Sequence, residues 1–192
     1  MSIRIVKEHQ YTVNHRGTCT FDLLWWDVEL VGETDQQLVR QDIWNSNVAH
    51  CPGRRLYTGG SQLLDHIIQT STSSLVELIP LVLPHTLVKM RWYRDLQYYQ
   101  DQLRPWVEIM VDSAGTAMNP HLDNSHIVVQ LIVNLADNDS GTEIYSINSP
   151  DPIYKLTGEK NKGIMLFNSP GALHGINNVN RDRYILYAGL TI

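Results

Sequence analysis

The sequence has few cysteines, no excess of basic charge and no long hydrophobic run. Only two of its 192 residues are cysteine, Cys19 and Cys51, and they form no C-x-x-C pair. Two such cysteines make neither a disulfide scaffold nor a cysteine-ligated zinc site, so a reduced, cytoplasmic setting is expected. The net charge is −5, which argues against a broad basic surface for nucleic acid.

Membrane segments and several common catalytic motifs are also missing. The most apolar run, residues 75–84, carries Glu77 and two prolines and is far too short to span a bilayer. The first ten residues lack the apolar core of a signal peptide. There is no H-E-x-x-H, no G-x-x-x-x-G-K-[ST], no G-x-G-x-x-G and no G-x-S-x-G. These absences argue against the corresponding metalloproteases, nucleotide-binding folds and serine hydrolases.

The composition is that of an ordinary folded protein, with 43% hydrophobic and 18% charged residues. No repeat and no Pro/Gly/Ser-rich linker divides the chain, so its 192 residues are expected to form one domain. Residues 1–105 are expected to supply helices and flanking strands. Residues 106–192 are expected to form the core that holds the functional site.

Short apolar segments separated by turn residues dominate the second half. They predict strands at 106–112, 126–135, 142–147, 164–167 and 183–192. Many short strands at this spacing are typical of a sandwich or barrel. The first half predicts strands at 3–13 and 21–31, a helix over 59–71 with Ser61 as N-cap, and a short helix over 73–84 stopped by proline. Helices packed outside such strands make the predicted fold class α+β.

The residues most indicative of chemistry are His121, Asp123 and His174. His121 and Asp123 are two apart, so in an extended segment both side chains point to the same side and reach one metal. His174 follows 53 residues after His121 (174 − 121) and becomes a third ligand if the strands form a barrel. Two histidines and one carboxylate on one face of an octahedron leave three positions open, as in non-haem iron(II) oxygenases.

An arginine lies near the third of these residues. Arg183 follows His174 by nine positions (183 − 174) and begins the last predicted strand. A buried guanidinium pairs a carboxylate with two parallel hydrogen bonds, so it suits the far end of a dicarboxylate whose near end chelates the metal. Arg181 has the same strand parity and stays an alternative. Arg183 is preferred because it directly precedes the apolar YILYAGL.

The H-x-D pair, the distal histidine and the arginine on the last strand together resemble the 2-oxoglutarate/iron(II)-dependent dioxygenase superfamily, in particular its prolyl-hydroxylase-like branch. The segments that match are NPHLDN, GTEIY (141–145) and GALHGINNVNRDRYILYAG, all within residues 106–190. The resemblance implies a double-stranded β-helix (a jelly-roll or cupin-like barrel) that uses Fe(II), 2-oxoglutarate and O2. It also implies release of succinate and carbon dioxide. Members usually place a basic residue ten positions after the distal histidine, whereas here the gap is nine.

Three further residues are candidates for binding 2-oxoglutarate or substrate. Gln130 and Asn134 share one face of the apolar strand 126–135, and buried polar residues there would need partners. The alternative is that they face solvent on an edge strand. Tyr145 offers a hydroxyl, although a strand tyrosine is more often a core or rim residue. The five tryptophans are interpreted as packing residues, with room for one of them in a substrate pocket: Trp25, Trp26, Trp44, Trp92 and Trp106.

The sequence thus predicts an oxygenase that hydroxylates a protein side chain, an amino acid or a small metabolite. Asp123 favours hydroxylation over halogenation, because related halogenases lack this carboxylate. A non-catalytic or non-redox metal-binding β-barrel is the main alternative. Oxidation of a nucleic-acid base is a third hypothesis, which the acidic net charge disfavours.

Overall fold

The computed structural model describes residues 1–15, 17, 19–42, 53–89, 101–169, 171–177 and 179–192. It contains two α-helices, Gln36–Asp42 (α1) and Gln62–Lys89 (α2), within these ranges. The strands described are Ser2–His15 (β1), Cys19–Val31 (β2), Arg54–Leu56 (β3), Arg104–Asp112 (β4), Met118–His121 (β5), Ile127–Asn134 (β6), Thr142–Tyr145 (β7), Pro152–Lys155 (β8), Lys162–Phe167 (β9), Leu173–Ile176 (β10) and Arg183–Thr191 (β11).

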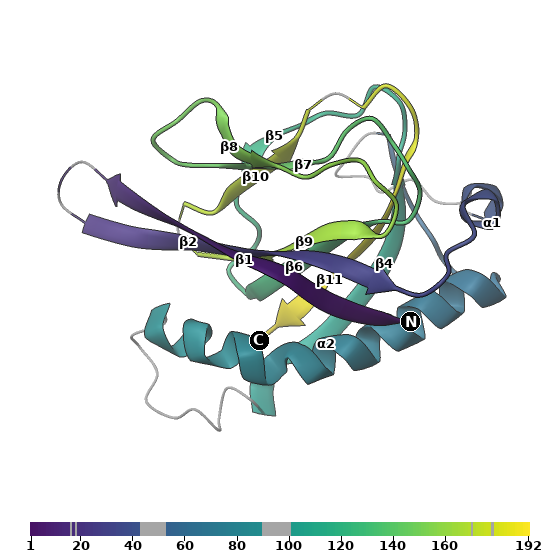
Figure 1. Cartoon of the computed structure of the whole chain (residues 1–192), viewed down its shortest axis with the longest axis horizontal. Helices are drawn as coiled ribbons and strands as arrows, with labels where there is room; N and C mark the ends of the chain where they lie inside the picture. The colour runs from purple at the N-terminus through teal and green to yellow at the C-terminus, as the bar shows by residue number, and fades with distance from the viewer. Residues whose placement is uncertain (16, 18, 43–52, 90–100, 170, 178) are drawn as a thin grey trace.

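The strands form two antiparallel sheets that face each other. The larger has the order β1-β2-β9-β6-β11-β4-β3, and the smaller has the order β5-β10-β7-β8. From β4 onward the chain passes repeatedly from one sheet to the other, which is the winding of a double-stranded β-helix. Figure 1 shows the small sheet on one side of the large sheet and α2 on the other. The predicted barrel with helices of the N-terminal half outside it is confirmed.

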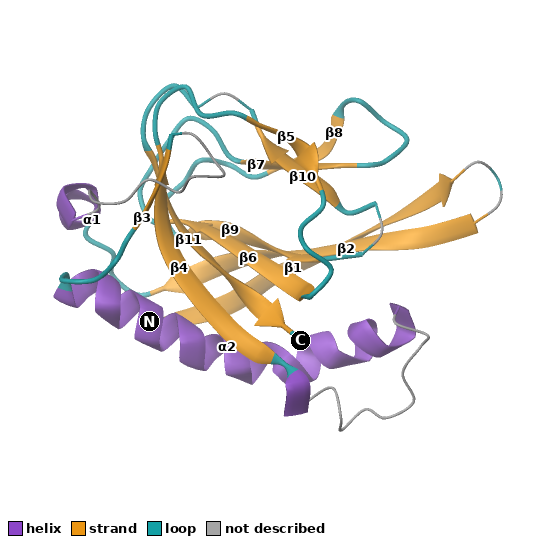
Figure 2. Ribbon diagram, turned by 180° about the vertical axis from the view of Figure 1, so that it is seen from behind, coloured by secondary structure: helices purple, strands orange, loops and turns teal. Residues whose placement is uncertain are grey.

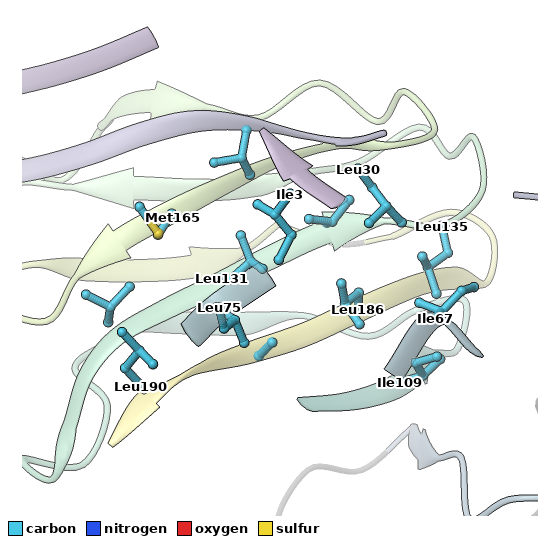
Figure 3. Packing of buried hydrophobic residues seen from close by; sticks show 14 of the residues in the cluster. Ile3, Leu30, Ile67, Leu75, Ile109, Leu131, Leu135, Met165, Leu186 and Leu190 are labelled. Carbon is cyan, nitrogen blue, oxygen red and sulfur yellow. The ribbon is translucent and has the colours of Figure 1, made fainter. Parts of the chain in front are cut away.

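Two hydrophobic cores lie on either side of the large sheet. One packs the sheet against α2 and includes Ile67, Leu75, Ile109 and Leu186, which Figure 3 shows on facing elements. The other fills part of the space between the sheets. It includes Met110, Ile132, Ile144, Ile164 and Ile185. Alternate residues of β4, β6 and β11 therefore enter opposite cores, which explains why β6 and β11 are largely apolar.

The helix α2 differs from the prediction of two short helices. It runs unbroken over 28 residues and contains Pro80 and Pro84. Both prolines are exposed, so any carbonyl that loses its helical partner can be hydrated by water. The predicted N-cap is confirmed, since the Leu64 amide donates to Ser61 Oγ at 3.3 Å. Figure 2 shows α2 along the face of the large sheet that is turned away from the small sheet.

The short elements β3, β5, β8, β10 and α1 were not predicted. They have three to seven residues each, too few for a periodic pattern to stand out. Two of them, β5 and β10, carry the metal-ligand candidates. No helix in the described ranges is long and apolar enough to cross a membrane.

Candidate metal centre and cavity

Pairing of β5 with β10 brings the three predicted metal ligands together. His121 at the end of β5 is the direct partner of His174 in β10, and their ring centroids are 4.4 Å apart. Asp123 Oδ1 lies 3.8 Å from Nε2 of each histidine. One donor atom from each of the three residues falls within 4.8 Å of the other two, which is close enough for all three to hold one metal ion.

Hydrogen bonds on the far side of each ring aim both Nε2 atoms at Asp123. His121 Nδ1 lies 2.9 Å from the carbonyl oxygen of Asn119, to which it donates. His174 Nδ1 lies 3.1 Å from the side-chain amide of Gln130. A ligating histidine usually donates its other ring N–H to such an acceptor, which fixes the tautomer and the ring orientation. Both Nε2 atoms are then free of protons and face the same point.

The orientation of the Gln130 amide follows from this network. As placed, its nitrogen faces His174 Nδ1, and its buried oxygen makes no hydrogen bond within the described residues. Amide nitrogen and oxygen are assigned by their hydrogen bonds rather than seen directly. Exchanging them lets His174 Nδ1–H donate to Gln130 Oε1 and satisfies the orphaned acceptor. Gln130 is therefore an acceptor for the histidine ring.

Replacing Gln130 with leucine is expected to weaken metal binding by about 10- to 100-fold, the usual cost of losing a hydrogen-bond partner behind a ligand. The measurement is Fe(II) or Ni(II) affinity, with thermal unfolding of the metal-free protein recorded alongside. Gln10→Leu, on the exposed face of β1, is the matched control. An unchanged affinity in Gln130→Leu would show that the amide does not orient His174.

Burial lowers the pKa of His174 to about 4, although the Asp123 carboxylate acts in the opposite direction. The imidazole is therefore neutral at neutral pH, the state required of a metal ligand. Between pH 6.5 and about 4 the unfolded chain binds a proton here that the folded chain does not. The stability contributed by neutral His174 is complete above that window and is lost as the pH falls through it.

The metal-free protein is thus expected to become easier to unfold between pH 6.5 and 4. Urea unfolding at pH 7, 5.5 and 4.5 measures this, with His174→Gln for comparison. The fall in the free energy of unfolding should be smaller in the variant, because its side chain does not titrate. Equal pH dependence in the two proteins would contradict a neutral buried imidazole.

Asp123, the third ligand, is held by Tyr187, which was not among the residues predicted from the sequence. Tyr187 of β11 donates its hydroxyl to Asp123 Oδ2 at 3.1 Å, which leaves Oδ1 toward the histidines. Burial raises the pKa of Tyr187 far above its ordinary value, and the Asp123 carboxylate adds to the rise. The phenol thus remains a neutral donor. Arg183 lies four residues before Tyr187 on the same strand, so both side chains point to the same face. This shared face was the signal in the sequence that could have identified Tyr187.

A buried charge cluster lies on the neighbouring strands β11 and β4. Arg183 is fully buried and is the strand partner of Asp112 in β4. Its Nη1 lies 3.6 Å from Asp112 Oδ2, and its Nη2 donates to Thr142 Oγ1 at 2.8 Å. Arg54 binds the other Asp112 oxygen at 2.6 Å. Burial lowers the pKa of Arg183 to about 10, so the guanidinium still carries its charge at neutral pH.

The metal ligands and three members of this cluster, Arg54, Thr142 and Arg183, line one cavity of about 720 Å³ between the sheets. This size is typical of small-molecule sites. Arg183 and Thr142 lie at one part of the wall, and Trp106, Glu108 and Tyr187 at another. His126 also lines the cavity but does not belong to the metal cluster.

No protein-family model and no curated protein matches this sequence. Solved structures do match the fold. A Pseudomonas putida prolyl-4-hydroxylase has a TM-score of 0.57 at 11% identity, over 87% of this chain and 91% of its own. A Trichoplax adhaerens prolyl hydroxylase, in complex with a peptide fragment of the hypoxia-inducible factor oxygen degradation domain, has a TM-score of 0.58. It is 13% identical over 87% of this chain and 83% of its own. The fold is that of the prolyl hydroxylases.

Within this prolyl-hydroxylase fold, the two arginine candidates have different environments. Arg183 is fully buried and lines the cavity. The side chain of Arg181 is 57% exposed, and its Nε lies 3.9 Å from Asp139 Oδ1. Only Arg183 is placed where it can meet a ligand in the cavity.

The other predicted cosubstrate residues do not line the cavity. Gln130 and Asn134 are buried on the central strand β6, so the solvent-facing alternative is wrong. Asn134 donates to the carbonyl oxygens of Thr157 and Glu159 and so anchors the loop before β9. Tyr145 donates to Glu143 at 2.5 Å. Of the tryptophans, Trp106 lines the cavity, while Trp44 and Trp92 are outside the described residues.

Proposed function

We propose that this protein is a non-haem iron(II)- and 2-oxoglutarate-dependent oxygenase that hydroxylates a second substrate. The observation that carries the proposal is the cluster of His121, Asp123 and His174 on the wall of a cavity. Two imidazoles and one carboxylate with open positions is the donor set of iron(II) oxygenases. The shared fold with two prolyl hydroxylases supports the same assignment.

The residues present fit an iron(II) ion. Both histidines have Nδ1 engaged and Nε2 directed toward Asp123. Asp123 in turn has one oxygen bonded to Tyr187 and the other directed to the histidines. Burial keeps His174 neutral, so its lone pair is available without loss of a proton. Each ligand therefore has the outer partner that a metal centre requires.

The residues present also fit a dicarboxylate cosubstrate. Nε and Nη1 of Arg183 are buried and make no hydrogen bond within the described residues, so the guanidinium retains donors for a carboxylate. Its Thr142 partner is two residues along β7 from Ile144, which pairs with His174. Two strand residues span about 7 Å, which suits a short dicarboxylate reaching from the metal to Arg183.

Iron(II) bound here would supply oxygen activation, coupled to decarboxylation of 2-oxoglutarate to succinate and carbon dioxide. The chain's own residues bind and orient the reactants. Arg183 and Thr142 hold the distal carboxylate, and Tyr187 and Gln130 keep Asp123 and His174 in position. The apolar walls at Ile132, Ile176 and Ile185 limit the water that enters the site.

The test is succinate formation. The protein is loaded with Fe(II) without oxygen, mixed with 2-oxoglutarate and then exposed to air. Succinate is expected above a no-enzyme control. Protein that binds metal tightly but forms no succinate with any candidate substrate would instead be a non-redox metal-binding barrel.

A further inference from the structure

A part of the cavity that lies away from Arg183 along β4 and β11 carries the opposite charge. Of the described residues lining the cavity, Glu108 is the only acid apart from Asp123. Glu108 and Asp112 are four residues apart on the same face of β4, so their positions are separated by about 13 Å. The basic end of the cavity holds Arg183 and Arg54 around Asp112. A single dicarboxylate at the basic end therefore leaves the Glu108 end to the second substrate.

Glu108 is placed beside the metal centre by strand pairing. It is the direct partner of Tyr187 across β4 and β11, and Tyr187 donates to the ligand Asp123. The Glu108 side chain makes no hydrogen bond or ion pair within the described part of the chain. It is exposed, so its charge is hydrated and ready to exchange water for a ligand. The carboxylate thus lies one strand away from the residue that orients the metal ligand.

Two aromatic rings stand next to this carboxylate. Trp106 and Tyr187 meet edge to face, with centroids 4.6 Å apart and planes at 73°. At Gly189 an added Cβ would lie 2.1 Å from the Val129 carbonyl oxygen of β6 and 3.2 Å from the Trp106 indole. The absence of a side chain therefore lets β6 approach β11 closely and also leaves the indole in contact with β11. Aromatic faces beside a carboxylate are the surroundings in which an ammonium or guanidinium group is held.

We propose that the second substrate carries a cationic amino or guanidinium group, which binds against Glu108 beside the contacting rings of Trp106 and Tyr187. This inference rests on the proposed function, because it assigns the substrate end of the same cavity. The cation would be held at the Glu108 end while a neighbouring carbon faces the metal centre.

The test measures binding rather than turnover. The protein is loaded with Ni(II) and 2-oxoglutarate and titrated calorimetrically with N-acetyl-lysine amide and N-acetyl-arginine amide. N-acetyl-norleucine amide and N-acetyl-citrulline amide are the neutral counterparts. At least one cationic probe is expected to bind about 10-fold more tightly than its counterpart. Glu108→Gln should remove this preference, and Glu77→Gln, an exposed acid on α2, should keep it.

Equal binding of cationic and neutral probes by the wild-type protein would overturn the inference. So would an undiminished preference in Glu108→Gln, or no binding of any of the four probes. Measuring iron and 2-oxoglutarate binding by the same preparation distinguishes a failure of the cation subsite from a failure of the oxygenase proposal. If both bind but no cation is preferred, the subsite assignment fails alone. If neither binds, the oxygenase proposal itself fails.

Discussion

Asp123→Ala is expected to lower Fe(II) affinity and 2-oxoglutarate turnover by more than about 100-fold. Loss of an outer partner behind a ligand already costs about 10- to 100-fold, and Asp123 is proposed as a ligand itself. The variant leaves two histidines whose Nε2 atoms face each other without the carboxylate between them. Anaerobic metal titration and the succinate assay measure the two losses separately.

The matched control is Asp139→Ala, an exposed carboxylate in the turn before β7. It should retain metal affinity and turnover. Asp123→Ala should also unfold at a temperature close to that of the metal-free wild type, because Asp123 is not part of either core. Metal binding that survives in Asp123→Ala would mean that the ion is held elsewhere.

Arg183→Met is expected to have two large effects. The KM for 2-oxoglutarate should rise by about 100-fold or more, because the distal carboxylate loses two charge-assisted hydrogen bonds. The protein should also lose about 3–5 kcal/mol of unfolding free energy, the usual cost of removing one partner of a buried ion pair. Arg54 stays bound to Asp112, which places the loss toward the lower end of this range.

Two further variants separate binding from stability. Arg181→Met removes an exposed side chain and should change stability by less than about 0.5 kcal/mol, with no change in KM. Adding Asp112→Asn to Arg183→Met also removes the partner of Arg54, so it should lower stability further while leaving the raised KM for 2-oxoglutarate unchanged. A raised KM in Arg181→Met with a normal KM in Arg183→Met would reverse the assignment.

The metal cluster was predictable because its residues follow simple chain geometry. His121 and Asp123 are two apart at a strand end, and His174 returns to them through the pairing of β10 with β5. The choice between Arg181 and Arg183 was harder, since both have the same strand parity. Burial separates them, and burial depends on the packing of β11 against β4 and β6, which no local pattern contains.

The outer partners of the ligands were the least predictable. Gln130 was a candidate for binding a ligand directly, yet it contacts His174 from a strand of the opposite sheet. Tyr187 and Glu108 are ordinary strand residues in sequence, and only the register between β4 and β11 brings them side by side. Contacts between sheets depend on the barrel as a whole. The short strands β5 and β10 escaped prediction because four residues show no clear alternation.

The most direct measurement of the central claim is an anaerobic titration of the protein with Fe(II) and then 2-oxoglutarate, followed by visible absorption. One iron should bind per chain, and an absorption band should appear only when both Fe(II) and 2-oxoglutarate are present. The band should be absent in Asp123→Ala and should require much more 2-oxoglutarate in Arg183→Met. A wild-type protein that binds no iron, or binds it without forming the band, would contradict a metal centre on His121, Asp123 and His174 that accepts 2-oxoglutarate.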